Sequence, residues 1–361
     1  MSRAAPAPGP LRVVQWTTGN VARQTVRAVL ARPDLRLVGA FAHSDAKDGR
    51  DVAELCGLPE PTGILATGDA EALLALQPDC VVYTPLHPDV DELTAILGRG
   101  VNVVTSSEFL TGSGLDPVDL AAIERAAGTG GASLFGSGMN PGFAQLLAAV
   151  GAGISIGVRH VRLTESVDVS LFAGDANMDD LGWGRPEGDP THPADVERAT
   201  AVFAEGVEVL ARLLGLGSSE LRCTVEFAVA EKDLDLPGRP IASGTVAGID
   251  VRWEALVDGR PRIESHQRWV MTRSLRPAWT VEHGYVVDIA GDPNIRLKLD
   301  IWPDVDDLAA LTLEDIHAIG MRITGVPLVN AIPSVCAAAP GIRTYADLPT
   351  VSTRITPWSP A

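Results

Sequence analysis

The first stretch that could form a chemical site is VVQWTTGNVAR, residues 13–23, in which small and hydroxyl-bearing residues follow a short apolar run. In a dinucleotide-binding strand–turn–helix unit, the glycines of GxGxxG let the backbone turn tightly and approach a pyrophosphate. Here Thr17, Gly19 and Ala22 take those positions, so the glycine beside the phosphate is kept. Thr17 then needs a negative or a strained φ, and its hydroxyl could donate to phosphate. The predicted cofactor loop consists of Thr17, Thr18, Gly19, Asn20 and Val21.

The end of the next apolar run, LVGAFAHSDAKDGR, bears on the choice of cofactor. A site that prefers NAD usually has an acidic residue here, about 20 residues after the glycines, which holds the ribose hydroxyls. The matching position is Ala42, and His43, Ser44 and Lys47 follow it. A hydroxyl and a cation suit a 2′-phosphate, so the sequence favours NADP, with NAD as the alternative. An ordinary solvated loop is the competing interpretation.

These residues need a scaffold, and residues 11 to about 140 supply an α/β pattern. The predicted strands are LRVVQW, LRLVGAFA, CVVYTP, VNVVTSS and SLFGSG, and helical patterns such as VARQTVRAVLARP and DVDELTAILGRG lie between them. Short buried strands alternating with helices predict a parallel sheet with right-handed crossovers, which is a Rossmann-type domain. Ligands of such sheets bind at the carboxyl ends of the strands.

The pattern changes after about residue 157. Alternating segments such as RCTVEFAVAE and IRLKLDIW, with turns such as VDGRP, predict a mostly antiparallel sheet, and ADVERATAVFAEGVEVLARLLGL predicts one helix. We therefore predict a dinucleotide-binding domain over 1–150, joined by the C-terminal segment 312–361, and an α+β substrate and oligomerisation domain over 151–311. An exposed apolar sheet face is expected to make a homodimer.

Charge and cysteine usage exclude several classes of protein. The net charge of -17 opposes binding to nucleic acid or to an anionic membrane. Cys56, Cys80, Cys223 and Cys336 form no CxxC pair, the histidines lack metal spacing, and the acidic loop at 174–190 lacks calcium-loop spacing, so no metal is expected. Without a secretory signal pattern or a long apolar run, a cytoplasmic protein is expected.

Further stretches match one family. They are QWTTGNVAR at 15–23, YTP at 83–85, VTSSEF at 104–109, GSGMNPGF at 136–143 and VNAIPSVCAAAPGI at 329–342. The sequence resembles the dihydrodipicolinate reductase-like oxidoreductases, and within them the 2,4-diaminopentanoate dehydrogenases and native amine dehydrogenases. The resemblance implies interconversion of ketones and amines with ammonia and a nicotinamide cofactor. It also implies cofactor contacts by Thr84, Pro85, Ser106, Asn140, Pro141 and Gly142.

The resemblance gives Glu108 the catalytic role, because a glutamate in this loop is catalytic in the amine dehydrogenases, whereas the reductases have glycine there. Residues 164–184 also lack the histidine pair and lysine with which the reductases hold a dicarboxylate. A carboxylate beside the nicotinamide can hold ammonium, take its proton and stabilise an iminium ion. Apolar walls from Phe109, Leu110 and Trp183 are expected to raise its pKa. A solvent-facing or turn-capping glutamate is the competing interpretation.

Glu165 and Asp168 lie three apart on a predicted strand, on opposite faces. One of them is predicted to face the substrate, and a hydrogen bond to the following loop is the alternative. The predicted substrate contacts are Phe109, Glu165, Asp168 and Trp183. The favoured function is an NAD(P)H-dependent amine dehydrogenase acting on a small ketone or aldehyde. The alternatives are an ammonia-independent reductase of a C=N or C=C bond and a non-catalytic NADP-binding regulatory protein.

Overall fold

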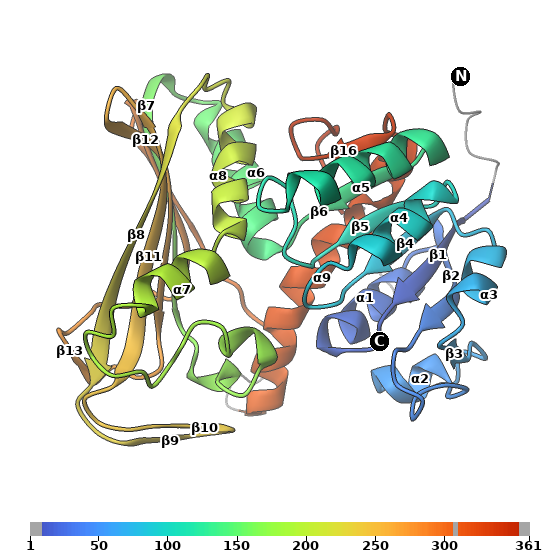
Figure 1. Cartoon of the computed structure of the whole chain (residues 1–361), viewed down its shortest axis with the longest axis horizontal. Helices are drawn as coiled ribbons and strands as arrows, with labels where there is room; N and C mark the ends of the chain where they lie inside the picture. Colours follow the sequence, from blue (N-terminus) through green and yellow to red (C-terminus); the bar gives the residue numbers. More distant parts are fainter. Residues whose placement is uncertain (1–8, 306–309, 354–361) are drawn as a thin grey trace. The chain divides into compact units, whose positions relative to one another are not determined.

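The computed structural model describes residues 9–305 and 310–353, which fold into two compact units (Figure 1). Unit 1 contains the chain up to Met139 and from Gly320 onward, and unit 2 contains Asn140–Ile319. The boundaries thus differ from the predicted 1–150 and 312–361. Helix α6 (Ala144–Ala152) belongs to unit 2, where Gly151 packs against Leu297. The first turns of α9 (Leu313–Ala337) also belong there, since His317 Nε2 lies 2.8 Å from Asp175 Oδ2.

Unit 1 is built on a parallel sheet, as predicted. Its strands lie in the order β16-β6-β5-β4-β1-β2-β3. Their bounds are β1 (Leu11–Trp16), β2 (Leu35–Phe41), β3 (Ala66–Thr67), β4 (Cys80–Tyr83), β5 (Asn102–Thr105), β6 (Ser133–Gly136) and β16 (Gly341–Arg343). Strand order reverses between β1 and β4, and ligands of doubly wound sheets bind at such a switch point. Strands β3 and β16 are absent from the prediction, because they are too short to show a period.

The helices of unit 1 are α1 (Asn20–Leu30), α2 (Val52–Cys56), α3 (Ala70–Ala75), α4 (Val90–Gly98), α5 (Pro117–Gly130) and the greater part of α9. An aspartate caps each of α2 to α5, and its carboxylate accepts a backbone N–H of the first turn. Helix α1 differs, because its cap is Gly19, which has no side chain to accept an N–H of the first turn. This difference leaves the start of α1 available to a ligand.

Helix α9 is long and apolar enough to cross a membrane by length and composition. The expectation that the chain has no long apolar run is therefore wrong for this segment. Leu328, Val329, Ala331 and Ile332 on this helix are fully buried within unit 1. Gly325 also packs against Val21 and Thr25 of α1. These contacts bury the apolar side chains in the second half of the helix, whereas Leu313 and Ile316 near its start are 64% and 37% exposed.

Unit 2 contains a mixed sheet in the order β13-β8-β11-β12-β7-β14-β15. Neighbouring strands are antiparallel except β12 and β7. The bounds are β7 (Ile156–Asp168), β8 (Glu220–Ala230), β11 (Val246–Val257), β12 (Arg260–Val270), β13 (Leu275–Arg276), β14 (Gly284–Asp292) and β15 (Ile295–Leu299). A hairpin of β9 (Leu234–Leu236) and β10 (Arg239–Ile241) stands apart. The prediction of an α+β fold with a mostly antiparallel sheet is confirmed.

Helices α6, α7 (His192–Ala199) and α8 (Val202–Leu213) lie on one side of this sheet (Figure 1). The single helix predicted over 194–216 is therefore wrong. Thr200 stands between α7 and α8, where its hydroxyl donates to Val196 O and accepts from Trp253 Nε1 at 3.1 Å. A side chain that bonds to its own backbone and to a distant strand favours a break in the helix.

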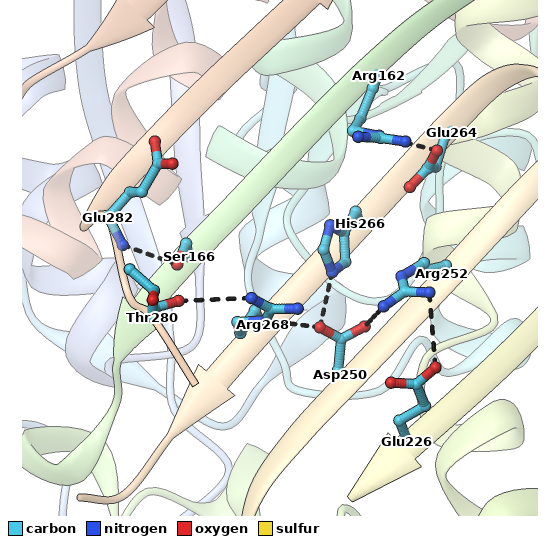
Figure 2. A network of polar contacts seen from close by, with 10 residues as sticks. All are labelled: Arg162, Ser166, Glu226, Asp250, Arg252, Glu264, His266, Arg268, Thr280 and Glu282. Atoms are coloured by element: carbon cyan, nitrogen blue, oxygen red, sulfur yellow. Dashed lines mark hydrogen bonds and ion pairs between the residues drawn. The ribbon is translucent and has the colours of Figure 1, made fainter. Parts of the chain in front are cut away.

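The opposite face of the sheet is charged rather than apolar, which corrects the stated basis for a homodimer. Among the described residues no helix covers this face, and Figure 2 shows its polar network. The Asp250 carboxylate, 1% exposed, accepts from His266 Nε2 at 2.8 Å and from Arg268 Nε at 2.7 Å. Arg162 Nε lies 2.9 Å from Glu264 Oε2. The paired charges explain why polar side chains alternate with apolar ones along these strands.

Candidate functional site

The predicted cofactor loop joins β1 to α1 as expected. Thr17 has φ 88°, a left-handed conformation that is strained for a β-branched residue by about 1–3 kcal/mol. Its N–H donates to Phe41 O at 3.1 Å, and its hydroxyl lies 2.9 Å from the Thr84 hydroxyl. Thr17 therefore has the strained φ rather than a negative one. Its hydrogen bonds to the ends of two other strands stabilise this conformation.

A buried glutamine, which the pattern analysis did not single out, supports the same loop. Gln15 Nε2 donates to Thr84 Oγ1 at 2.9 Å, and Gln15 Oε1 accepts from Thr25 Oγ1 at 2.5 Å. Gln15 is 1% exposed. In the sequence, only its position as a polar residue within the apolar run LRVVQW indicates such a role. This side chain thus connects the end of β1 to the end of β4 and to the second turn of α1.

The loop fits the pyrophosphate of a dinucleotide. A Cβ atom added at Gly19 would meet nothing within 4 Å, so open space lies above the backbone there. Asn20 and Val21 begin α1, whose dipole and uncapped N–H groups favour an anion. The Val21 side chain packs near Gly325 of α9, which leaves its backbone for the ligand. These residues therefore match a nucleotide-binding helix start.

The residues predicted to choose between NADP and NAD lie just after β2. His43 and Ser44 are exposed, and the His43 ring stands edge-on to Phe41 with 4.7 Å between centroids. Lys47 Nζ donates to the Thr18 hydroxyl at 3.1 Å. The structure thus brings Lys47 to the cofactor loop, where its charge would meet a phosphate.

Glu108 lies in the loop after β5, at the carboxyl edge of the sheet. Ser107 Oγ donates to Pro85 O at 2.6 Å, and half-buried Ser106 donates its N–H to Tyr83 O at 3.3 Å. The Glu108 side chain is 43% exposed, and its Oε2 lies 3.1 Å from His87 Nδ1. His87 is a further candidate that the pattern analysis missed, although it follows Pro85 closely in sequence. The structure therefore joins the loops after β4 and β5 around an exposed carboxylate–imidazole pair.

The apolar walls predicted around Glu108 are not formed by its neighbours in sequence. Phe109 is 0% exposed and Leu110 4% exposed, and Phe109 belongs to the core cluster of unit 1. The predicted substrate contact of Phe109 has no support in this structure, because water itself does not reach its ring. Its role is to anchor the loop: a Cβ atom on Gly136 would lie 1.7 Å from Phe109 O.

Asn140 begins unit 2 and forms hydrogen bonds at both ends of its amide. Its Nδ2 donates to Glu165 Oε2 at 2.7 Å, and its Oδ1 accepts from Gln145 Nε2 at 3.0 Å. Gln145 Oε1 in turn accepts the N–H of Gly142 at 2.6 Å, and Pro141 packs against Gly206 of α8. The predicted GMNPG loop is thus a hydrogen-bonded unit in which the orientation of the Asn140 amide is fixed.

Glu165 lies on β7, on the side of the sheet that the helices cover. Its Oε1 accepts from Trp269 Nε1 at 3.1 Å. Burial raises the pKa of the Glu165 carboxyl above its ordinary value, and the hydrogen bonds from Asn140 and Trp269 oppose that rise. The sequence singled out Glu165 but gave no sign of Gln145 or Trp269 as its partners.

The other two predicted substrate residues are placed differently. Asp168 Oδ1 accepts the N–H of Ser170 at 3.1 Å, at the start of a 3₁₀ helix, Ser170–Phe172. The hydrogen bond to the following loop, the alternative considered for Asp168, is therefore present. Trp183 is 6% exposed, in the chain after a second 3₁₀ helix, Ala176–Met178, and its Nε1 has no hydrogen-bond partner within the described part of the chain. This unpaired indole N–H is itself shielded from water, so its burial costs desolvation energy and gives the predicted substrate contact no support.

The doubly wound sheet, the uncapped helix after Gly19 and the polar strand-end loops are those of a Rossmann-type nucleotide-dependent oxidoreductase. Residues 145–357 match the model of the 2,4-diaminopentanoate dehydrogenase C-terminal domain, and the chain belongs to that family.

Similar proteins agree with this assignment. An amine dehydrogenase of Streptomyces virginiae is 29% identical over 360 residues, which cover 94% of this chain and 96% of that protein. A 2,4-diaminopentanoate dehydrogenase of Acetoanaerobium sticklandii is 28% identical over 267 residues, covering 72% of this chain and 69% of the relative. The solved amine dehydrogenase from Mycobacterium smegmatis has a TM-score of 0.77 at 23% identity, covers 96% of this chain and 98% of that chain, and shows the same fold.

Proposed function

We propose that this chain is an amine dehydrogenase that aminates a small ketone or aldehyde with ammonia, using a reduced nicotinamide cofactor, and that it also catalyses the reverse deamination. The observation that carries the proposal is the exposed Glu108 carboxylate beside His87, on the sheet edge that also carries the cofactor loop. Family membership, the amine dehydrogenase relative and the 2,4-diaminopentanoate dehydrogenase relative support the class: an NAD(P)-dependent oxidoreductase that acts on CH–NH₂ groups.

Thr17, Thr18, Gly19, Asn20 and Val21 would hold the pyrophosphate through the loop and the start of α1. Thr84, Pro85 and Ser106 lie on the strand ends beside this loop. Asn140, Pro141 and Gly142 follow β6 after a link of only Ser137, Gly138 and Met139. We assign these three residues to the nicotinamide end. The bound nicotinamide supplies a hydride for amination and accepts one in deamination.

In this proposal Glu108 performs the proton transfers of the reaction. Its carboxylate binds ammonium and removes a proton, so that neutral ammonia attacks the carbonyl carbon. The protonated carboxyl then returns a proton to the hydroxyl group that leaves as water, and the carboxylate stabilises the positive iminium ion. His87, 3.1 Å from Glu108 and 58% exposed, exchanges protons with solvent for Glu108.

Ammonium dependence separates this function from an ammonia-independent C=N or C=C reductase. The test measures NADPH and NADH oxidation by the purified chain with a panel of small ketones and aldehydes. Each is assayed with and without ammonium at alkaline pH, where more ammonia is unprotonated. We expect turnover only with ammonium. Turnover of the same strength without it would support the reductase, and cofactor binding with no turnover would support a regulatory protein.

The choice of NADP over NAD is a separate part of the proposal, supported by Lys47 at the cofactor loop and Ser44 nearby. Replacing Lys47 by alanine should raise the Kd for NADP about tenfold, or ~1.4 kcal/mol, by removing one charged phosphate contact. The Kd for NAD should hardly change, and Lys232→Ala in unit 2 is the matched control. Equal losses for both cofactors, measured by calorimetry, would remove Lys47 from the 2′-phosphate site.

The proposal also covers the oligomeric state, the binding partners and the cellular location of the protein. We propose a cytoplasmic homodimer whose partner molecules are a small carbonyl or amine compound and the cofactor. The net charge of -17 supports the absence of nucleic-acid and anionic-membrane partners. The mixed charges of Figure 2 would make any interface on that sheet face a polar one. Light scattering of the purified chain gives the oligomeric state.

A further inference from the structure

The helix-covered face of the sheet in unit 2 contains a row of polar side chains that the proposed chemistry does not use. Glu165 on β7 pairs with Gln267 on β12 and with Tyr285 on β14. Gln267 is 0% exposed, and burial together with the charge of Glu165 raises the pKa of Tyr285. A carboxylate in such surroundings is expensive to bury, so its hydrogen bonds require an explanation.

Each carboxylate oxygen of Glu165 accepts from a different donor. Oε2 accepts from Asn140 Nδ2 at 2.7 Å, and Oε1 accepts from Trp269 Nε1 at 3.1 Å. At the other end of the Asn140 amide, Oδ1 accepts from Gln145. Asn140 is therefore held from both sides, with one N–H and one lone pair of its amide left for a further partner.

We infer that Glu165 is a positioning residue: it fixes the orientation of the Asn140 amide at the nicotinamide end of the cofactor and does not itself contact substrate. This inference rests on the proposed function, which assigns Asn140 to that end. It replaces the earlier expectation of a substrate contact, because both oxygens of Glu165 already bind donors of its own unit. Trp269 holds the carboxylate, the carboxylate holds Asn140, and Gln145 connects Asn140 to the backbone at Gly142.

The chemistry of the two donors explains why a carboxylate is required. Asn140 Nδ2 and Trp269 Nε1 both offer hydrogens, and a carboxylate can accept both. A glutamine at position 165 has only one acceptor oxygen, so its own N–H₂ would face one of the donors. If Trp269 is replaced by phenylalanine, that conflict disappears, and the glutamine oxygen can turn to Asn140. A leucine at position 165 accepts nothing in either case.

The experiment therefore compares Glu165→Gln with Glu165→Leu, each alone and each combined with Trp269→Phe. We expect each single replacement at position 165 to lower kcat/KM by about 100-fold. A loss of this size is typical when the reacting groups are displaced by about 1 Å. When Glu165→Gln is combined with Trp269→Phe, kcat/KM should recover to within about fivefold of the value for Trp269→Phe alone. The remaining fivefold corresponds to about 1 kcal/mol, the net contribution of one hydrogen bond. The leucine variant should not recover. If Glu165→Gln and Glu165→Leu have the same kcat/KM when each is combined with Trp269→Phe, the inference is overturned.

Two measurements need no turnover. The indole N–H resonance of Trp269, assigned among the seven tryptophans by its loss in Trp269→Phe, should move in Glu165→Leu. An unchanged resonance would show that the hydrogen bond is absent in solution. In addition, Glu165→Leu and Asn140→Ala should each weaken NADPH binding about tenfold, ~1.4 kcal/mol, and together no further. Additive losses, or none, would mean that Glu165 does not act through Asn140.

The outcomes keep the two ideas apart. If the unaltered chain shows no ammonium-dependent turnover but the two replacements share one loss of NADPH affinity, the proposed reaction is wrong and the positioning role stands. If ammonium-dependent turnover is present and the losses are additive, the reaction stands and the positioning role is wrong.

Discussion

Replacement of Glu108 by glutamine is expected to lower kcat of the ammonium-dependent reaction by about 100- to 10,000-fold, the range for loss of a positioned acid–base group. Glutamine keeps the size of the side chain and a bond to His87 Nδ1, but it cannot take a proton from ammonium or stabilise an iminium ion. Because the side chain is 43% exposed and outside the core, the free energy of unfolding should stay nearly unchanged.

Steady-state kinetics and cofactor titration together check this prediction. The Kd for NADPH should be unchanged, since the cofactor loop at Gly19 does not involve Glu108. Glu124→Gln, an exposed glutamate on α5 of the same unit, is the matched control and should keep full activity. Activity retained in Glu108→Gln would assign the exposed carboxylate a structural role only.

Replacement of Gly136 by alanine is expected to have the largest effect on stability. The added Cβ atom would lie 1.7 Å from Phe109 O and 2.6 Å from Phe109 C, distances at which the backbone of β6 and of the Glu108 loop must separate. Overpacking a fully buried contact of this kind should lower the free energy of unfolding by about 3–5 kcal/mol. Activity should fall with it, because the displaced loop carries Glu108.

Urea unfolding measures the loss, and Gly128→Ala is the control. Gly128 lies in helix α5 and a Cβ atom there meets nothing within 4 Å, so alanine should raise stability by about 0.5–1 kcal/mol. If Gly136→Ala unfolds at the same urea concentration as the unaltered chain, the close approach of Phe109 to β6 is not present in solution.

The strand–loop–helix at residues 11–30 and the strand ahead of Glu108 were predictable, since the apolar runs and helical periods there are long and are punctuated by glycine or polar residues. The place of Glu108 at a strand end followed from that pattern, and its catalytic role came from the family resemblance. The surroundings of Glu108 were not predictable in the same way. An apolar residue such as Phe109 looks the same in sequence whether it lines a pocket or fills a core.

Contacts between distant segments account for what the sequence did not show. Strand β16 has three residues and exists because it pairs with β6, about half the chain away. The break between α7 and α8 depends on Trp253, whose indole reaches Thr200. The Asn140–Glu165–Trp269 hydrogen bonds join three elements, and neither the period of β7 nor that of β12 indicates a partner. His87 was missed because one histidine after a strand carries no distinguishing pattern.

Strand β7 faces two different environments with alternate residues. Glu165 points to the helices, while Arg162, Thr164 and Ser166 line the charged face. Because successive side chains of a strand point to opposite sides, one inserted or deleted residue upstream of Glu165 would exchange the two sets, and an arginine would enter the interior. This strand should therefore accept many single replacements on its charged face but no change of length by one residue, whereas a two-residue duplication would keep every side chain on its own side.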